Sequence, residues 1–519
     1  MWCGDGRNAG VQAGDEQAVL WARRFGTEGV AANQHPAAQG RGGSRRRAIL
    51  GTDTLSIEAR HLRPDISIVP VVRLATLAIG TALALFCLAP TALADGSAST
   101  LTPASPAYTI ALSSDANGRH WSGSEQIEFH NPSSLTLDTI WLRLWSNGVR
   151  GCGYSAISVT QISGGRAGSL SQRCTALPVT LDEPLGPGGS ATISMHVAIS
   201  VPSKNDRFGY HGGLAMLGSV VPTLAIHDGD GWHLDPFVDL GESFYSVIGE
   251  YQVSLTVPRG LSTPSTGVLT ATRDNSDGTQ TRTYSASKVR DFEWAAGRLS
   301  SVEGKDSGGV RVRVSYNPST YSASAARGAL ANSIRAMNEF EHDFGSYPYP
   351  ELDVVLSPLP YHGMEYPTFV LSDTARISLS HEIAHQWWYG IVGNDQFSSP
   401  WLDESFATWS EYLPWTPSDC SKPRAWPSGA SRLTNSMAYW GRHPKEYWVI
   451  YDQGACALGA MADELGMNRF IGVLRGYASS HRFGISTTAG FKAAIENAAR
   501  DVPGWDVTQF WHTWRIGAG

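Results

Sequence analysis

Residues 381–385 read His-Glu-Ile-Ala-His, and Glu404 follows nineteen positions after the second histidine. Two histidines four residues apart on a helix lie on the same face, so both imidazoles reach one ion. A catalytic zinc ion takes three protein ligands from imidazole and carboxylate groups and leaves a fourth position for water. The pattern therefore predicts a zinc site of His381, His385 and Glu404, with Glu382 placed to take a proton from the metal-bound water. The alternative interpretation is an amphipathic helix that carries two histidines on its surface.

Helix signals surround this motif. The serine and aspartate at 372–373 can cap a helix over residues 374–391, and a second helix is expected to begin near Trp401 and to carry Glu404. Glu411 lies seven residues after Glu404, on the same helical face. Because metal-binding histidines are usually oriented by a carboxylate behind them, Glu411 is a candidate for that role. A plain solvated glutamate is the alternative.

The composition is that of an ordinary globular protein. The chain has 519 residues, enough for two or three domains with cores of their own. Hydrophobic residues make up 42% and charged residues 17%, and these values exclude wholesale disorder. The formal net charge of −7 offers no basic surface, so we expect no nucleic-acid partner.

Residues 1–94 are interpreted as a leader. The chain up to residue 66 is rich in Gly, Ala, Arg and Gln and lacks hydrophobic periodicity. An apolar segment over residues 74–94 follows an arginine and ends in Ala-Leu-Ala, which is typical of a secretory signal peptide. Either translation starts downstream of residue 1, or the segment is a signal-anchor that tethers the protein to a membrane. Both explanations predict export, with the chain after Asp95 secreted or held at the cell envelope, outside the cytoplasm.

Cysteine usage agrees with export. Four cysteines follow the leader: Cys152, Cys174, Cys420 and Cys456. An even number in an exported chain predicts two disulfides, for which three pairings exist. We predict the short-range pairing, Cys152 with Cys174 and Cys420 with Cys456, and four free buried thiols are the alternative.

The chain after the leader divides into a β-rich part and a mixed part. Alternating runs separated by Gly, Pro, Asn and Asp turns predict strands from Tyr108 to about Ser301, in a sandwich or a large open sheet. Beyond them the sequence predicts strands over 310–316, 352–356 and 368–371, a helix over 322–344, and helices from about 431 onward. The expected fold class is multidomain α+β, with a β domain over residues 95–305 and a second domain over 306–519.

Motifs of other chemistries are absent from the sequence. The sequence has no Gly-x-Ser-x-Gly motif, which removes the usual mark of a serine hydrolase. It also has no phosphate-binding glycine-rich loop with a lysine and no dinucleotide fingerprint. The metal site therefore carries the functional prediction alone.

Two further motifs flank the zinc motif. Residues 362–367 read His-Gly-Met-Glu-Tyr-Pro and precede it, and residues 451–455 read Tyr-Asp-Gln-Gly-Ala and follow it. Together with the zinc motif and Glu404, they resemble the aminopeptidase N family of zinc metallopeptidases, the gluzincins, which also includes leukotriene-A4 hydrolase. The resemblance covers most of the chain after the leader.

The resemblance implies a fold and a reaction. The fold is a saddle-like antiparallel β-sandwich followed by a thermolysin-like α/β catalytic domain with a helical C-terminal lobe. The chain resembles a short bacterial-type member that lacks the family's C-terminal helical domain. The implied reaction is the hydrolysis of peptide bonds in a peptide or protein substrate, with release of N-terminal residues and one Zn²⁺ per chain.

The resemblance also assigns roles around the metal. His381, His385 and Glu404 would bind zinc, and Glu382 would activate the nucleophilic water. Tyr451 would donate a hydrogen bond to the oxyanion of the tetrahedral intermediate. A phenol suits this role because it is a neutral donor whose hydrogen bond strengthens as negative charge develops. A core tyrosine that packs on a helix is the alternative for Tyr451.

The motif before the zinc helix would bind the substrate. Gly363 and Met364 would form an edge strand that pairs with the peptide backbone. Glu365 would bind the free α-amino group. A second acidic residue from the β domain usually helps to bind the amine in this family, and Glu242 is the nearest candidate here.

The sequence departs from the family pattern at several positions. The usual Gly-x-Met-Glu-Asn motif has its glycine shifted to Gly363 and its asparagine replaced by Tyr366, and Gln453 stands where the family usually has a lysine. These changes bear on strict N-terminal trimming more than on hydrolysis. A thermolysin-like endopeptidase or an epoxide hydrolase is therefore the alternative within the same chemistry. A catalytically silent peptide-binding protein of the cell envelope is the alternative from another class.

Overall fold

The computed structural model describes residues 106–149, 151–153, 156–228, 231–413 and 420–517. The predicted leader lies outside these ranges, so the signal peptide and the membrane tether stay predictions. Among the described residues, no helix combines the length and the apolar character that crossing a membrane requires. The described residues all belong to one compact unit. The predicted domain boundary after residue 305 therefore also stays a prediction.

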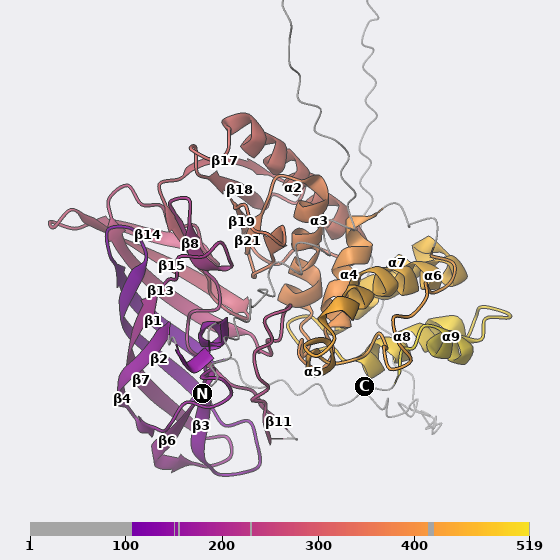
Figure 1. The fold of residues 1–519 in the computed structure, drawn as a ribbon, viewed down its shortest axis with the longest axis horizontal. Coiled ribbons are helices and arrows are strands. Elements are labelled where there is room, and N and C mark those ends of the chain that lie inside the picture. The colour runs from indigo at the N-terminus through magenta and orange to yellow at the C-terminus, as the bar shows by residue number, and fades with distance from the viewer. Residues whose placement is uncertain (1–105, 150, 154–155, 229–230, 414–419, 518–519) are drawn as a thin grey trace, which may run out of the picture. The chain divides into compact units, whose positions relative to one another are not determined.

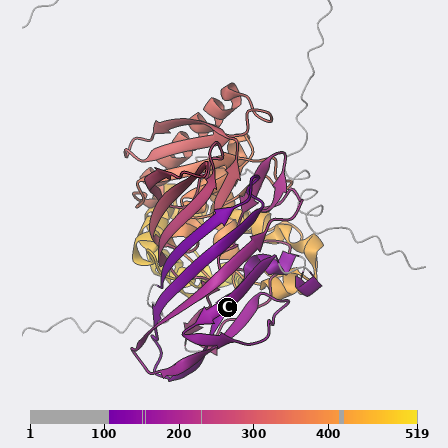
Figure 2. The ribbon, with the colours of Figure 1, turned by 90° about the vertical axis from the view of Figure 1, so that its left-hand side faces the viewer.

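The N-terminal half of the described chain is built on a seven-stranded sheet (Figure 1). In spatial order its strands are β14 (Val268–Asp274), β15 (Thr279–Val289), β13 (Gly249–Pro258), β1 (Ala107–Ser114), β2 (His120–His130), β7 (Ser190–Ser200) and β4 (Ile157–Ser163). Figure 2 shows these strands side by side across one face of the sheet. Along β13, Tyr251, Val253, Leu255 and Val257 are buried and alternate with more exposed residues. This period of two turns one apolar face toward the core.

The pairing of β1 differs from the expected antiparallel sandwich. β1 pairs in parallel with β13, with Tyr108 opposite Tyr251, whereas the other pairs of this sheet are antiparallel. Parallel pairing needs a long connection between the strands, and more than a hundred residues of chain separate β1 from β13. The prediction of a purely antiparallel sheet was therefore wrong at this pair.

Two smaller sheets complete the β-rich half. A four-stranded sheet has the order β10 (Thr223–Leu224), β3 (Leu137–Arg143), β6 (Ala176–Leu185) and β5 (Gly165–Ala167). A three-stranded sheet has the order β16 (Trp294–Gly297), β9 (Leu214–Leu217) and β8 (Phe208–His211). β11 (His227–Asp228) and β12 (Gly231–Trp232) pair antiparallel and form a separate two-stranded sheet.

The second half begins with a five-stranded mixed sheet. Its order is β17 (Ser300–Lys305), β18 (Arg311–Tyr316), β19 (Glu351–Leu356), β21 (Phe369–Ser372) and β20 (Gly363–Met364). The three central strands are parallel, and the two edge strands pair antiparallel to their neighbours. Every residue of β19 is buried, as expected of a central parallel strand. Helix α2 (Ala323–Phe344) begins at the cap residue Ser322 and contacts β17 and β18.

The remaining elements are helical, as the sequence predicts. They are α3 (Arg376–Ala384), η3 (Gln386–Ile391), α4 (Trp401–Glu411), α5 (Met437–Trp440), η4 (Pro444–Glu446), η5 (Val449–Gln453), α6 (Gly454–Leu465), α7 (Met467–Ser480), α8 (Thr488–Ala499) and α9 (Val507–Thr513). The strand-rich first half and the mixed second half together confirm the α+β class at this level of detail.

The prediction of a single helix over residues 374–391 was wrong in its extent. α3 ends at Ala384, and the π-helical turn η3 follows it. Inside this turn Trp388 (φ −97°, ψ 54°) and Tyr389 (φ 167°, ψ −64°) leave helical geometry. The aromatic run explains the break, because each side chain is held by a different segment. Trp387 donates to the carbonyl oxygen of Gly345, while the hydroxyl of Tyr389 donates to Asp291.

The predicted short-range disulfides are confirmed. Cys152 bonds to Cys174, with their Cα atoms 5.2 Å apart, and Cys420 bonds to Cys456, with their Cα atoms 4.6 Å apart. The first disulfide lies in the β-rich half. The second holds the chain at residue 420 against α6.

Arg290, directly after β15, joins the β-rich half to the helical half. Its side chain is buried, and its Nε donates to the carbonyl oxygen of Tyr389 at 2.6 Å. Nη1 and Nη2 donate to the carbonyl oxygens of Ser246 and Gly484 at 3.0 and 2.7 Å. Gly393 leaves room for the guanidinium, because a Cβ atom there would lie 2.1 Å from the Arg290 Cζ atom. One buried cation thus satisfies carbonyl groups of three segments that are distant in sequence.

Candidate metal centre and active site

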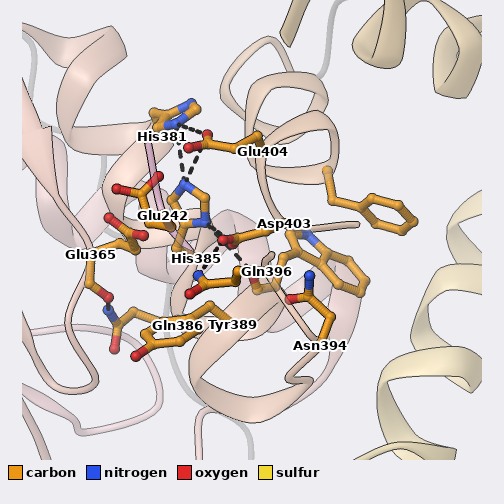
Figure 3. Close-up of polar contacts among 12 residues, drawn as sticks. Glu242, Glu365, His381, His385, Gln386, Tyr389, Asn394, Gln396, Asp403 and Glu404 are labelled. Carbon is orange, nitrogen blue, oxygen red and sulfur yellow. Dashed lines mark hydrogen bonds and ion pairs between the residues drawn. The ribbon is translucent and has the colours of Figure 1, made fainter. Parts of the chain in front are cut away.

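Three buried side chains converge where α3 and α4 meet (Figure 3). α3 carries His381, His385 follows directly at its C-terminal end, and α4 carries Glu404. The Nε2 atoms of the two histidines are 3.1 Å apart. The Oε2 atom of Glu404 lies 3.3 Å from Nε2 of His381 and 3.6 Å from Nε2 of His385. The structure therefore brings together the three residues that the sequence predicts as metal ligands.

The chemistry of this group fits a zinc ion. It offers two imidazole nitrogens and one carboxylate oxygen, the ligand set of a catalytic zinc with one open position. Oε2 of Glu404 is buried and has no hydrogen-bond partner among the described residues. A buried carboxylate oxygen without a partner costs free energy, which a cation between these three atoms would offset.

Carboxylates behind the histidines fix the orientation of both rings. Nδ1 of His381 donates to Glu411 at 2.8 Å, and Nδ1 of His385 donates to Asp403 at 2.6 Å. Asp403 in turn accepts a hydrogen bond from Gln396. Each Nε2 atom is thereby left without a proton, as a lone-pair donor that can bind a metal ion. Asp403 was missed in the sequence, although it is the neighbour of Glu404 in the chain and α4 turns its side chain toward the adjacent histidine.

The carboxylate of Glu382 lies against the backbone of Gly363. A Cβ atom added to Gly363 would lie 2.2 Å from Oε1 of Glu382, so only glycine leaves room for this carboxylate. Burial raises the pKa of Glu382 to about 8, while His381 and His385 lower it. A carboxylate whose pKa lies near neutrality both accepts and returns a proton readily, as a general base must.

The glycine that contacts Glu382 belongs to the edge strand β20. Gly363 and Met364 pair antiparallel with Ser372 and Leu371 of β21, and β20 forms the end of the five-stranded sheet. One backbone edge of β20 therefore has no strand partner within this sheet. The sequence predicts an edge strand at these two residues, and β20 has that position.

Tyr451 points at the metal site from the turn η5. Its hydroxyl donates to Oε1 of Glu404 at 2.8 Å, and its ring stacks 6.2 Å from the ring of His381. Burial raises the pKa of Tyr451 well above its usual value of 10, and Glu404 adds to the rise. The phenol is therefore a neutral hydrogen-bond donor at the edge of the metal site.

A cavity of about 20 Å³, room for about one water molecule, lies among these groups and contains two more carboxylates, Glu365 and Glu242. Burial raises the pKa of Glu365 well above its usual value, and Glu242 adds to this rise. Burial also raises the pKa of Glu242 to about 7, against the effect of Arg207, which lowers it. Nη1 of Arg207 donates to Oε1 of Glu242 at 2.6 Å. The structure thus places Glu242, the weaker sequence candidate, in the cavity together with Glu365, and adds Arg207, which the sequence did not indicate.

Two departures from the family pattern have a structural explanation. The Tyr366 side chain is not part of the cavity lining. It is buried against Gly218, where a Cβ atom would lie 1.9 Å from its hydroxyl oxygen. Gln453 is also buried. Its Oε1 accepts a hydrogen bond from the backbone N–H of Arg424 at 3.0 Å, and its Nε2 donates to the carbonyl oxygen of Arg424 at 2.8 Å. Only an amide makes both bonds, so a lysine at this position would lose one of them.

The sequence is similar to the sequences of curated aminopeptidases. The chain is 25% identical to aminopeptidase M1-C of Oryza sativa subsp. japonica over 252 residues, which are 42% of this chain and 28% of that protein. It is 27% identical to aminopeptidase N of Lactococcus lactis subsp. lactis over 154 residues, which are 26% of this chain and 18% of that protein. The predicted resemblance to the aminopeptidase N family is confirmed. The chain spans less than a third of the length of these curated relatives, and no family model matches it.

Solved structures extend the likeness to the fold. The M1 zinc metallopeptidase of Deinococcus radiodurans superposes with a TM-score of 0.58 over 80% of this chain and 94% of its own, at 18% identity. A mutant of that protein, bound to a Tyr-Ser-Ala substrate, has the same TM-score at 20% identity. At this identity the likeness establishes the fold of the aminopeptidase N-type peptidases, while the activity rests on the residues themselves.

Proposed function

We propose that the protein is a zinc metallopeptidase that removes residues from the free N-terminus of peptides. The observation that carries this proposal is the convergence of His381, His385 and Glu404 beside a buried glutamate, Glu382, that is held for proton transfer. A binding protein has no need of such a base. The names of the aminopeptidase relatives support the same conclusion.

The three converging side chains would hold the zinc ion. When bound, zinc lowers the pKa of a coordinated water molecule and polarises the substrate carbonyl group. Glu382 accepts the proton of the attacking water and returns it to the leaving nitrogen. Tyr451 donates its hydroxyl proton in a hydrogen bond to the oxygen that becomes negative, and its raised pKa keeps that proton in place.

The substrate would be held at two points. Its backbone adds to the free edge of β20 at Gly363 and Met364, which aligns the scissile bond with Glu382. Its α-ammonium group lies between Glu365 and Glu242, the two carboxylates of the small cavity. Glu242 is already paired with Arg207, but Oε1 of Glu365 is buried without a hydrogen-bond partner among the described residues. An α-ammonium group satisfies this oxygen better than a neutral, acetylated N-terminus does.

Cleavage of one peptide in its free and N-acetylated forms tests this proposal, with a Glu382→Gln variant beside the wild type. We expect the wild type to cleave only the free form, and the variant to bind zinc while losing activity by about a hundredfold or more. The exposed Glu464→Gln change on α6 is the matched control and should leave both properties unchanged. Equal cleavage of both peptides would point to an endopeptidase, and full activity of the Glu382→Gln variant would exclude the proposed base.

We further propose that the protein acts outside the cytoplasm. Two disulfides between described cysteines support this, because disulfides persist in oxidising compartments. The leader predicted over residues 1–94 agrees with it. Fractionation of cells that express the full chain, with the disulfide state of each fraction measured by thiol labelling, checks the location.

A further inference from the structure

A second cavity, of about 660 Å³, lies apart from the metal site and shares no lining residue with the small cavity there. Five segments line it: residues 267–268 at the start of β14, residues 285–289 at the end of β15, residues 348–351 before and at the start of β19, Thr368, and Arg482 with Phe483. The volume is in the range of cavities that bind small molecules and short peptides, roughly 300–1,000 Å³. None of the roles proposed above uses this cavity.

One wall of the cavity is a free strand edge. β14 pairs with β15 only as far as Val268 opposite Ser285, and the chain before β14 bridges to β16 instead, at Ser265 and Trp294. In the described part of the chain, no strand pairs with residues 286–289 on the cavity side, while β13 pairs on the other side with Ala286, Ser287 and Val289 and skips Lys288 at a bulge. A free edge presents backbone donors and acceptors to an incoming strand.

The direction of these backbone groups follows from Gly267. A Cβ atom added to Gly267 would lie 2.5 Å from the carbonyl oxygen of Ser285, so this carbonyl faces the β14 side. Backbone groups alternate in direction along a strand, so Ser287 turns its N–H and C=O to the same side, which is the cavity side. The next carbonyl oxygen, that of Lys288, accepts the hydroxyl of Tyr349 at 2.7 Å.

The cavity has two cations at its rim. Lys288 and Arg482 are exposed, and each places its charge 5.2 Å from the centre of the Phe483 ring. Neither forms an ion pair with another described residue. The carboxylates nearby are engaged: Glu351 pairs with Arg311, and Glu250 accepts a hydrogen bond from the hydroxyl of Ser287 at 2.9 Å. The two cations at the rim therefore have no carboxylate paired with their side chains among the described residues.

The backbone around these groups is fixed in an unusual conformation. Three lining residues have positive φ values: Lys288 (57°), Phe483 (63°) and Thr368 (59°). Residues other than glycine rarely adopt this backbone conformation. Such conformations persist only where the surroundings enforce them, and they cluster at binding sites. The backbone of Phe483 and the strand edge are thus held in position before any ligand arrives, which lowers the entropy cost of binding.

We propose that this cavity binds an extended acidic peptide segment, which adds as a short strand to the free edge of β15. The backbone of Ser287 pairs with the peptide backbone, and the peptide carboxylates pair with Lys288 and Arg482. Apolar side chains on the other face of the peptide pack on Pro348 and Phe483. The site is separate from the proposed hydrolytic site, and its occupant is held rather than cleaved there.

Fluorescence anisotropy with the Glu382→Gln protein tests the site without cleavage of the probe. The probe is fluorescein-Val-Glu-Val-Glu-Val-amide, compared with the same peptide carrying glutamine for glutamate and with a version whose central valine is N-methylated. We expect the glutamate peptide to bind most tightly, and both changes in the peptide to weaken binding by about fivefold to tenfold.

Substitutions at the rim complete the test. Lys288→Gln combined with Arg482→Gln should weaken binding of the glutamate peptide by about fivefold to tenfold and leave the glutamine peptide unaffected. Lys445→Gln, an exposed lysine on η4, is the matched control, and circular dichroism checks the fold of each variant. Unchanged affinity in the double variant would overturn the charge pairing. Equal binding of the N-methylated peptide would overturn the strand addition and leave a plain anion site.

Discussion

Glu411 acts on the metal site without touching the space where the ion would lie. Its carboxylate accepts the Nδ1 proton of His381 at 2.8 Å and so fixes both the tautomer and the tilt of the ring. The sequence indicated this role from the position of Glu411 on the face of α4 that carries Glu404. The corresponding partner of His385 is Asp403, whose role depends on how the two helices cross.

The Glu411→Gln substitution should weaken zinc binding. Glutamine keeps the size of the side chain but removes the charge that strengthens the imidazole as a ligand, and we expect the zinc affinity to fall about 10- to 100-fold. Competition with a chromogenic chelator measures it. The exposed Glu464→Gln variant should bind zinc like the wild type, and equal affinities of all three proteins would contradict the role of Glu411.

Gly363→Ala tests the contact with the proposed base. The added Cβ atom would lie 2.2 Å from Oε1 of Glu382 and force this carboxylate out of place. Displacement of a catalytic group by about 1 Å lowers the rate about a hundredfold, so we expect kcat to fall strongly while zinc stays bound. Gly472→Ala on α7, where a Cβ atom meets nothing within 4 Å, is the control. Wild-type kcat in Gly363→Ala would show that Glu382 has room to move.

The ligands could be predicted from the sequence because their spacing is local. The four-residue interval between the histidines is a helical repeat, and Glu404 lies in the next helix. Arg207 and Gly218 could not be predicted, because each contributes through a contact between segments far apart in the chain. The same holds for Tyr366, whose side chain turns away from the cavity because Gly218 leaves space for its ring.

At the scale of elements, strand β2 buries a carboxyl group. Glu125 is 2% exposed, and its Oε1 atom has no hydrogen-bond partner among the described residues. Burial raises the pKa of Glu125 well above its usual value of 4.5. The folded chain therefore binds this proton more tightly than the unfolded chain does. Stability from this group is complete below the unfolded pKa and is lost as the pH rises toward the folded pKa.

Glu125→Met should therefore stabilise the protein, and more so at high pH. Methionine fills a similar volume without a group to desolvate or ionise, and we expect the Tm at pH 8 to rise by about 2 °C or more, with a smaller gain at pH 5. Differential scanning fluorimetry across this range measures it. Glu128→Met in the same strand is exposed and should show no such pH dependence. A gain that did not change with pH would mean that Glu125 has a usual pKa in the fold.

The elements were predicted well where their pattern is periodic and poorly where it is not. The three central strands of the mixed sheet, β18, β19 and β21, and helix α2 lie within a residue or two of their predicted bounds, because apolar periodicity marks them. The helix after β21 is shorter than predicted, because contacts of Trp387 and Tyr389 with other segments override the local helical pattern. No local sequence pattern indicates that β1 pairs in parallel with β13.

At the scale of the whole molecule, Arg290 holds the two halves of the described chain together. Its substitution by methionine would leave the carbonyl groups of Tyr389 and Ser246 without this donor, while the carbonyl oxygen of Gly484 would keep the N–H of Gly393 at 3.1 Å. Each buried carbonyl left unpaired costs about 1–3 kcal/mol, so we expect Arg290→Met to lower the Tm by roughly 5 °C or more. Arg335→Met, an exposed arginine on α2, is the control in the same thermal melt. A melting temperature equal to that of the control would show that water replaces the guanidinium.

Arg290 also supplies what many proteins obtain from a bound structural ion: one positive centre that several carbonyl oxygens share. An ion of that kind exchanges with the solvent and is lost to chelators or dialysis. A guanidinium attached to the chain is lost to neither. We therefore expect that stripping the proposed catalytic metal leaves the contacts of Arg290 between the two halves intact, so that the metal-free form can bind zinc again.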